Sequence, residues 1–428
     1  MRFDTLEAWL SWQEGLHPSA MDLGLERVRR VAADMPWPEV RPFPLIVVAG
    51  TNGKGSSVAY LDAIYTAAGF RTGTYTSPHL QRYNERICIG REEASDEALM
   101  EAFARLDEAR KDLTITYFEY GTLAAMDLFV RSEVDVAIME VGIGGRLDAV
   151  NIFDSDCALV TAVDIDHRKW LGDTREAIGL QKAGIFRAGK PAVCSDPSPP
   201  ESLCDHAQQL GISLRLLGRD FVVSPAGPKH WRFAGHGEAQ ELPLPGLPGA
   251  WQQQNAAGAL AVVEALSERL PVTTLARGDG VRAPGLRGRL HTVRTAPRTI
   301  VDVGHNPQAV RSIATYLRET AINGKTLAVV AMLADKDIEP TLAQLRPQID
   351  AWYVGSTCGP RGMRSSELAA ALREGMPEAL RVTSAESVTD AYRYACAAAT
   401  EADRIIVFGS FHTVGEVMDA LDFFRQAG

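Results

Sequence analysis

The sequence predicts an α/β protein of two domains, each built on a mostly parallel sheet. Apolar strand-like segments alternate with helical segments, which is typical of parallel sheets covered by helices. The same alternation starts again after a break near residue 285. The chain has 428 residues, more than one hydrophobic core usually serves. We therefore expect a larger domain over residues 1–285 and a smaller one over residues 286–428.

The first block alternates strands and helices in the order that a doubly wound sheet requires. Apolar runs predict strands at Leu45–Ala49, Val134–Met139 and Cys157–Val163. Helix-forming stretches lie between them at Asp96–Lys111 and Gly121–Arg131. Because the connections are long enough to be helical crossovers, the strands are expected to run parallel.

The pattern changes near the end of this block. Short alternating segments at Phe221–Ser224 and His230–Phe233, within residues 219–249, predict an antiparallel insertion at the edge of the first domain. Residues 276–285 contain several glycines and a proline, which predicts a turn-rich hinge.

The second block resumes the alternation and predicts a Rossmann-like domain. Its expected strands are Thr299–Val303, Thr326–Met332, Ala351–Val354 and Arg404–Phe408.

A glycine-rich segment, Val47–Ser57, leads from the first strand into a helix expected over Ser57–Ala68. Glycines allow successive backbone N–H groups to converge on a phosphate, and the helix N-terminus and Lys54 add positive charge. The first domain is therefore of P-loop type, although Val48 replaces the first glycine of the standard pattern and Gly55 follows the lysine. The alternative is a glycine-rich turn without a ligand. The expected nucleotide-binding residues are Thr51, Asn52, Gly53, Lys54, Gly55 and Ser56.

Glu140 follows the strand predicted at Val134–Met139 and precedes a glycine-rich run, Gly142–Gly145. A carboxylate at the carboxyl end of a parallel strand faces the ligand crevice and suits Mg²⁺. The alternative is a carboxylate that only caps the next turn.

His167 and Lys182 follow the next strand, and a helix containing Lys182 is expected to start near Thr174. A single histidine is usually structural and a single helical lysine is usually solvated. We consider both as site residues only because the glycine-rich loop is also present. The turn Thr76–Leu80 and the strand end Asp302–Pro307 are further candidates. Pro307 suits the first turn of a helix, which leaves Asp302 and His305 in the crevice of the second domain.

Composition limits the classes of partner. The net charge of −10 argues against nucleic acid, and no apolar run approaches the roughly 20 residues that span a bilayer. Six scattered cysteines without paired spacing predict buried thiols, with neither disulfides nor a zinc site. We expect a cytoplasmic protein with no membrane partner.

The motifs together resemble one family from end to end, folylpolyglutamate synthase of the bacterial bifunctional dihydrofolate synthase type, in the Mur ligase superfamily. The N-terminal segment Met21–Val28 resembles that family's opening helix motif. In chain order the other matching motifs are AGTNGKGSS, TSPHLQRYNERI, TYFEYGT, EVGIGGRLDAVN, DIDHRKWLG, QKAGIFR, QQQNAAGAL, GLRGRL, VDVGHNP, MLADKDI and GSFHTVGEV.

The resemblance implies an ATP-dependent ligase that joins L-glutamate to dihydropteroate or to a reduced folate. The acceptor carboxylate attacks the γ-phosphate, and the glutamate amine then displaces phosphate from the acyl phosphate. It also implies a monomer whose two domains close over ATP.

The resemblance assigns roles to individual residues. It implies ATP and two Mg²⁺ ions, with Lys182 modified to N6-carboxylysine, although Gln181 stands where the family often has an acidic residue. The implied catalytic residues are Lys54, Glu140, His167 and Lys182, and the implied metal ligands are Ser77, Glu140 and His167. Further nucleotide contacts are implied at Asn255, Arg289, Asp302 and His305. The implied substrate pocket consists of Asp22, Leu23, Gly24, Thr116, Tyr117, Phe118, Glu119, Leu147, Asp148 and Ala149.

Two other readings compete. A Mur-type peptide ligase uses the same chemistry, but such enzymes usually carry a further N-terminal domain, whereas the loop here begins at Gly50. A non-catalytic nucleotide-binding regulator or a simple hydrolase is the other alternative, and retention of Lys54, Glu140, His167 and Lys182 argues against the regulator.

Overall fold

One buried strand lies at the centre of the larger sheet. The computed structural model describes residues 2–357, 359, 361–374 and 381–427. In it, β1 (Leu45–Ala49) is buried at every position. β1 pairs in parallel with β5 (Val136–Glu140) on one side and with β6 (Cys157–Val160) on the other. Its continuous apolar sequence suits a strand that is covered on both faces.

Within the described residues this sheet has eight strands, in the order β4-β3-β2-β5-β1-β6-β7-β8. The run from β2 to β8 is parallel, and β3 and β4 add an antiparallel edge. The prediction of a mostly parallel sheet is confirmed. The remaining strands are β2 (Thr72–Tyr75), β3 (Ile87–Ile89), β4 (Glu92–Glu93), β7 (Ala192–Cys194) and β8 (Leu214–Leu216).

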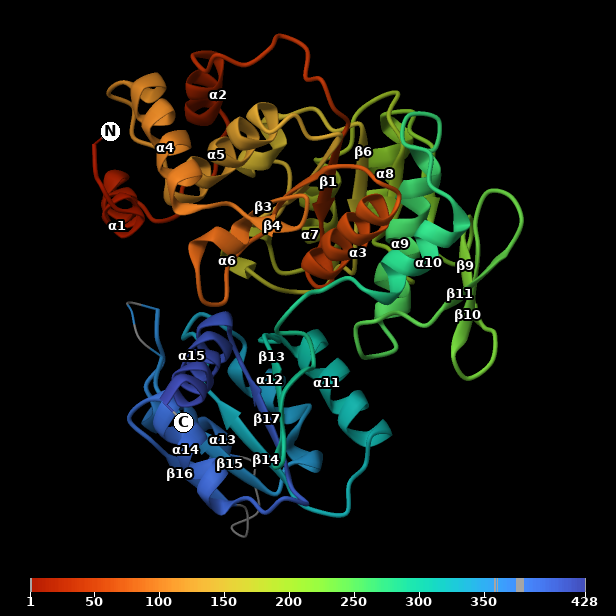
Figure 1. Cartoon of the computed structure of the whole chain (residues 1–428). Helices are drawn as coiled ribbons and strands as arrows, with labels where there is room; N and C mark the ends of the chain where they lie inside the picture. The colour runs from red at the N-terminus through yellow and green to blue at the C-terminus, as the bar shows by residue number, and fades with distance from the viewer. Residues whose placement is uncertain (1, 358, 360, 375–380, 428) are drawn as a thin grey trace. The chain divides into compact units, whose positions relative to one another are not determined.

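Helices cover both faces of the sheet, as a doubly wound fold requires (Figure 1). One core joins the sheet to α1 (Leu6–Leu16), α2 (Glu26–Ala33), α4 (Asp96–Arg110), α5 (Tyr117–Arg131), α7 (Arg175–Ala183) and α8 (Glu201–Gln209). On the other face α3 (Lys54–Ala67) and α9 (Gln252–Ala265) contact the strands, and α10 (Thr274–Arg282) packs on α3. Short helical segments complete the unit at η1 (Tyr83–Arg86), η2 (Ala149–Ile152) and α6 (Arg168–Leu171).

The predicted antiparallel insertion is confirmed as a separate three-stranded sheet. Its strands are β9 (Val222–Pro225), β10 (His230–Ala234) and β11 (Gln240–Pro243), with β10 in the middle. Burial alternates along β10, where Trp231 and Phe233 are buried. This is the period of two that a sheet with one covered face shows.

The predicted hinge over residues 276–285 is wrong for most of its length, because residues 274–282 form α10. The side chain of Thr273 caps this helix by accepting a hydrogen bond from the backbone N–H of Ala276. A Cβ at Gly280 would overlap the backbone Cα and N of Ile64 in α3. Gly280 thus allows two helices to pack closely. From sequence alone, a glycine of this kind cannot be distinguished from a glycine in a turn.

Several predicted element ends differ from the structure by a few residues. β5 ends at Glu140 instead of Met139, and β6 ends at Val160 instead of Val163. The helix after the glycine-rich loop begins at Lys54 instead of Ser57. The polar residues that follow these strands therefore belong to loops at the carboxyl edge of the sheet.

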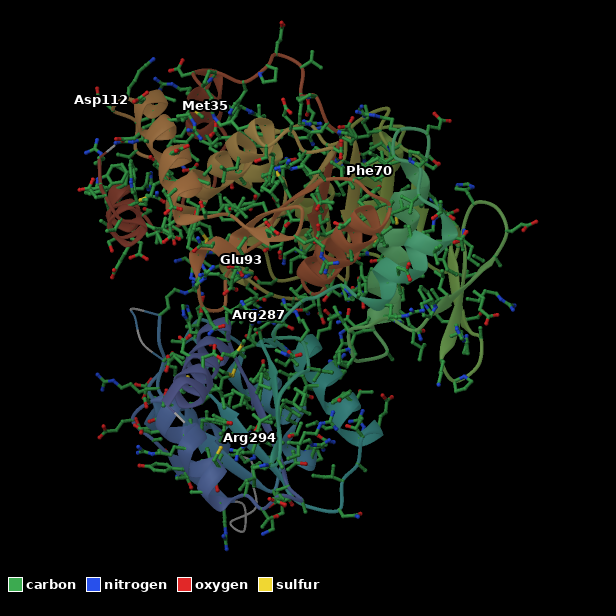
Figure 2. The ribbon with its side chains drawn as sticks, in the orientation of Figure 1. Met35, Phe70, Glu93, Asp112, Arg287 and Arg294 are labelled. Carbon is green, nitrogen blue, oxygen red and sulfur yellow. The ribbon has the colours of Figure 1, made fainter. Side chains whose placement is uncertain are left out.

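The second sheet has six strands among the described residues, in the order β12-β13-β17-β14-β15-β16. All pairs are parallel except that of the edge strand β12, which carries Arg294 (Figure 2). Arg294 donates from Nη1 to Sγ of Cys396, 3.8 Å away. The strands are β12 (His291–Thr295), β13 (Arg298–Asp302), β14 (Thr326–Val330), β15 (Ala351–Val354), β16 (Arg381–Ser384) and β17 (Arg404–Phe408).

Two separate apolar clusters cover the faces of this sheet, which confirms the Rossmann-like α/β architecture. One contains α11 (Pro307–Glu319), α12 (Ile338–Ala343) and α13 (Ser365–Arg373), and the other contains α14 (Val388–Ala398) and α15 (Phe411–Ala427). A 3-10 turn, η3 (Arg346–Gln348), follows α12. In the part of the chain that the structure describes, no helix is long and apolar enough to cross a bilayer.

The chain divides into two compact units. The first contains residues 1–79, 83–246 and 252–285, and the second contains residues 286–428. The second also takes in two short segments, 80–82 and 247–251, which the sequence prediction assigned to the larger domain.

Among the cysteines, Cys157 and Cys194 are buried, while Cys88, Cys204 and Cys396 are partly exposed. All five are free thiols, and Cys358 lies outside the described residues.

The contact between α10 and α3 predicts opposite effects for two glycines of one helix. Gly280→Ala is expected to destabilise the first unit by about 1–3 kcal/mol, because the new methyl group overlaps the α3 backbone. Gly278→Ala is the matched control, since its nearest new contact is Pro243 Cδ at 3.4 Å and alanine favours a helix. Urea unfolding followed by circular dichroism measures both. Equal stability of the two variants would contradict the close packing.

Candidate functional site

The glycine-rich loop runs from the end of β1 to the first residue of α3. Gly53 precedes the helix with a φ of +93°, a conformation that favours glycine. The first backbone bond within the helix runs from Ser57 N to Gly53 O, at 2.9 Å. The N–H groups of Lys54, Gly55 and Ser56 therefore have no acceptor within the helix, and they can bind an anion.

The residues after β6 hold the loop in shape. Thr51 N donates to Ala162 O at 2.7 Å, and Thr51 Oγ1 donates to Asp164 O at 2.8 Å. The hydroxyl of Thr161 donates to Asn52 O at 2.8 Å. Thr51, which we predicted to bind nucleotide, therefore uses its N–H and its hydroxyl to shape the loop.

Asn255 lies against the loop although it is about 200 residues away in sequence. A Cβ at Gly53 would overlap Oδ1 of Asn255, so the two residues are in close contact. Asn255 Nδ2 donates to Gln252 Oε1 at 3.0 Å, and Gln252 Nε2 lies 3.4 Å from Ser56 Oγ. The beginning of α9 therefore flanks the loop and the beginning of α3.

Lys54 and Glu140 bring opposite charges together at the loop. Lys54 Nζ donates to Gly50 O at 3.2 Å and lies 3.8 Å from Oε1 of Glu140. Both side chains are mostly buried. Ser77 approaches from the loop after β2, with its backbone N 3.5 Å from Oε2 of Glu140. Two of the three predicted metal ligands, Ser77 and Glu140, thus lie side by side.

His167, the third predicted metal ligand, lies in the loop after β6. It has a φ of +53° and precedes α6. Its Nε2 is 4.0 Å from Oδ2 of Asp166, and its backbone N–H donates to Asp166 Oδ1 at 2.8 Å. In the described ranges, no three His, Cys, Asp or Glu side chains are grouped as a metal site.

Lys182 is buried on α7, and the predicted helix start near Thr174 is confirmed by that residue's N-cap. Burial and, to a smaller extent, the positive charge of Lys54 together lower the pKa of Lys182 to about 7. Asp166 and Asp148 oppose this shift. The electrostatic coupling indicates that Lys182 and Lys54 share one local field.

Asp148 belongs to the loop that follows Glu140. Burial raises its pKa to about 7, while hydrogen bonds from the backbone of Ile143 and Val150 oppose the shift. These two bonds, at 2.9 and 3.0 Å, occupy the two carboxyl oxygens. Asp148, which we predicted to bind substrate, holds the turn between Ile143 and Val150. Leu147 is partly exposed beside it, and Ala149 is buried at the start of η2.

The other predicted substrate residues come together from two segments. Thr116 and Glu119 form a capping box at the start of α5. Arg27, which the sequence reading missed, donates to Asp22 Oδ2 at 2.7 Å and to Glu119 Oε1 at 3.1 Å. This arginine connects the segment Asp22–Gly24 to the beginning of α5. Its place within the N-terminal motif was the only available signal.

The two aromatic residues between Thr116 and Glu119 differ in their contacts. Phe118 lies against Gly142, where a Cβ would come 2.7 Å from its ring. Tyr117 packs edge-on against Tyr83, with 5.6 Å between ring centroids. Phe118 therefore connects the α5 segment to the loop after Glu140.

The predicted nucleotide residues of the second unit lie near the end of β13. Asp302 is buried, and it accepts hydrogen bonds from Leu290 N at 2.9 Å and Gly304 N at 2.8 Å. Burial raises the pKa of Asp302, and the charge of Arg289 opposes this shift. His305 Nδ1 lies 2.9 Å from Val303 O, and Arg289 lies over the ring of Phe411. Pro307 begins α11, as predicted.

Comparison with known proteins gives the same family from sequence and from structure. The model of the Mur ligase middle domain matches residues 48–195, and that of the Mur ligase glutamate ligase domain matches residues 288–411. Dihydrofolate synthase/folylpolyglutamate synthase of Escherichia coli is 44% identical, over 99% of this chain and 97% of that protein. The Haemophilus influenzae protein of the same name is 39% identical, over 96% of each chain.

Solved structures of related enzymes have the same fold as this chain over nearly its whole length. Escherichia coli FolC in complex with DHPP and ADP superimposes with a TM-score of 0.92 at 43% identity, over 99% of both chains. The bifunctional enzyme of Yersinia pestis, complexed with AMPPNP and Mn ion, gives a TM-score of 0.88 at 42% identity, over 98% of both chains. This chain belongs to the dihydrofolate synthase/folylpolyglutamate synthase family.

Proposed function

We propose that this protein is an ATP-dependent ligase that joins L-glutamate to dihydropteroate and to reduced folates. The observation that carries the proposal is the position of Lys54, whose ammonium group lies over the glycine-rich loop and 3.8 Å from Glu140. The loop, the lysine and the carboxylate form the arrangement that phosphoryl transfer needs. The names of the related proteins support the same pair of reactions.

The reaction proceeds in two steps. An oxygen of the acceptor carboxylate attacks the γ-phosphorus of ATP, the bond to ADP breaks, and an acyl phosphate forms. The amino nitrogen of glutamate then attacks the acyl carbon, phosphate leaves, and the nitrogen loses a proton. The product is an amide.

The loop residues contribute charge and alignment to these steps. The first N–H groups of α3 and the Nζ of Lys54 counter the charge of the triphosphate. Asn255, held beside Gly53 by Gln252, fixes one side of the nucleotide site. Since phosphoryl transfer requires little covalent help, positioning of this kind supplies most of the catalysis.

A divalent cation suits the side chains of Ser77, Glu140 and His167, because a hydroxyl, a carboxylate and an imidazole can all donate to it. When bound, Mg²⁺ neutralises phosphate charge and orients the γ-phosphate. Glu140 keeps its carboxylate directed toward the loop through its contacts with Lys54 and Ser77.

We also propose that Lys182 becomes N6-carboxylysine and helps to hold a second cation. Its pKa of about 7 leaves a large neutral fraction at neutral pH. A neutral amine attacks CO₂, forming an N–C bond and releasing a proton, and the resulting carbamate is anionic. The change places a negative charge at Lys182, which would otherwise be neutral or positive, in the field that it shares with Lys54.

The pteridine end of the acceptor is assigned to the segments that Arg27 and Phe118 connect. Phe118 offers an aromatic face next to Gly142, and Arg27 holds Asp22 and Glu119 in place. The nucleotide contact of Arg289 and the monomeric state are proposed from the family resemblance. Those of Asp302 and His305 are proposed also from their place at and after the end of β13, and a cytoplasmic location is proposed from the composition. The peptide-ligase and regulator alternatives lose support, because the related proteins match this chain over nearly its whole length.

Loss of the Lys54 charge is expected to reduce catalysis strongly. Lys54→Ala should lower kcat for acceptor-dependent ADP formation about 100- to 1000-fold, because a preorganised charge at the phosphate is lost. The assay contains ATP, Mg²⁺ and L-glutamate with dihydropteroate, with a reduced folate monoglutamate, or with no acceptor. Lys229→Ala, an exposed lysine in the insertion, is the matched control. Equal ADP formation by the wild type without acceptor would indicate a hydrolase instead.

Modification of Lys182 is expected to depend on pH in a specific range. Because burial lowers its pKa from 10.5 to about 7, the reactive neutral amine increases as pH rises through 7. At fixed dissolved ¹³CO₂, a protein carbamate signal in ¹³C NMR should therefore increase between about pH 6 and 8. It should be absent in Lys182→Met and retained in Lys229→Met. A signal that is absent from the wild type would refute the modification.

A further inference from the structure

The guanidinium group of Arg86 is held in place by neutral groups. It lies over two tyrosine rings, with Cζ 5.3 Å from the centroid of Tyr83 and 5.4 Å from that of Tyr117. Its Nε donates to Nδ1 of His79 at 2.9 Å. No carboxylate of the described residues forms an ion pair with it. Two aromatic rings and one imidazole nitrogen thus contact the group, while no carboxylate of the described residues pairs with it.

Other half-buried or buried arginines of the first unit have acidic partners. Arg27 pairs with Asp22 and Glu119, Arg105 pairs with Asp127, and Arg215 pairs with Glu264. Arg86 differs from them although the protein carries a net charge of −10. A positioned guanidinium without an acidic partner among the described residues is suited to an anionic ligand, which its terminal amino groups can bind in a fork.

Contacts connect Arg86 to both ends of the proposed acceptor site. On one side Tyr117 is followed by Phe118, which lies against Gly142 in the loop after Glu140. On the other side His79 follows Ser77 closely in sequence, and Ser77 N lies 3.5 Å from Glu140 Oε2. Arg86 therefore contacts residues that are close in sequence to both the assigned pteridine segment and the assigned phosphate site.

The two acceptors differ in the anion that such a residue can bind. Dihydropteroate has one carboxylate, and that carboxylate reacts. The terminal glutamyl residue of a folate has two, of which one reacts and one does not. We propose that Arg86 binds the non-reacting carboxylate of the terminal glutamyl residue, and so serves folate elongation and not dihydrofolate formation. This inference rests on the proposed function, and it assigns a substrate group to a residue of the same site.

The first test compares the two acceptors in steady-state kinetics. Arg86→Gln should raise KM for a reduced folate monoglutamate about 10- to 100-fold, the effect of losing hydrogen bonds to a charged group. KM for dihydropteroate should change far less. Arg86→Lys keeps the charge and loses the planar fork, so its KM for the folate should lie between those of the wild type and Arg86→Gln. Arg232→Gln removes an exposed arginine on β10 and serves as the matched control.

The second test changes the ligand instead of the protein. In this ligand the non-reacting carboxylate of the folate acceptor is converted to a carboxamide. Its KM with the wild type should rise about as much as the KM of the unmodified folate rises with Arg86→Gln. With Arg86→Gln, the KM values for the folate and for its carboxamide should be the same. A structural role for Arg86 would not produce this coupling. If Arg86→Gln fails to fold by circular dichroism, Arg86→Lys and the carboxamide decide the question.

The outcomes separate this inference from the function on which it rests. A wild type that forms no ADP with either acceptor refutes the proposed ligase. A wild type that uses both acceptors, together with an Arg86→Gln variant that loses equally on both or on neither, overturns only the role of Arg86. A wild type that uses dihydropteroate alone also overturns that role.

Discussion

The candidate site depends on the hydrogen-bond register of β1 between β5 and β6. Val48 lies opposite Glu140 on one side and opposite Leu159 on the other. Because these strands are parallel, their carboxyl ends meet at one edge of the sheet. The glycine-rich loop, Glu140 and the segment that carries His167 all follow from these ends. A shift of one residue in the pairing of β1 with β5 would turn Glu140 to the opposite face of the sheet.

Charge balance is the second constraint on this edge. Two lysines and three carboxylates lie close enough here to affect one another's charge. Lys54 pairs with Glu140, and the buried Lys182 interacts with Lys54, Asp148 and Asp166. Burial pushes Lys182 and Asp148 toward their neutral forms, since each pKa moves to about 7. The site can therefore change its net charge near neutral pH. This property suits a protein that must accept a triphosphate and then release a diphosphate and phosphate.

Much of this arrangement could be predicted from the sequence, because local patterns carry it. The apolar run Leu45–Ala49, the glycines after it and the polar residue at the end of β5 each have a short-range signal. The missing parts come from contacts between distant segments. Arg27 joins Asp22 to Glu119, and Gly280 packs on Ile64, and neither pairing can be read from residue order. Thr51 stays a predicted nucleotide contact, and the structure adds that its N–H and its hydroxyl hold the loop, a role that residue order does not show.

The contact between Gly53 and Asn255 has a consequence for how this chain can change over evolutionary time. The amide oxygen of Asn255 occupies the space that a side chain at position 53 would need. Any side chain at position 53 would therefore require Asn255 to move or to be replaced by a smaller residue, and it would also have to adopt a φ of +93°. Yet Asn255 is itself tied to Gln252, which approaches Ser56. Substitutions in the loop thus disturb contacts with a distant part of the chain, which limits the single changes that the loop can accept.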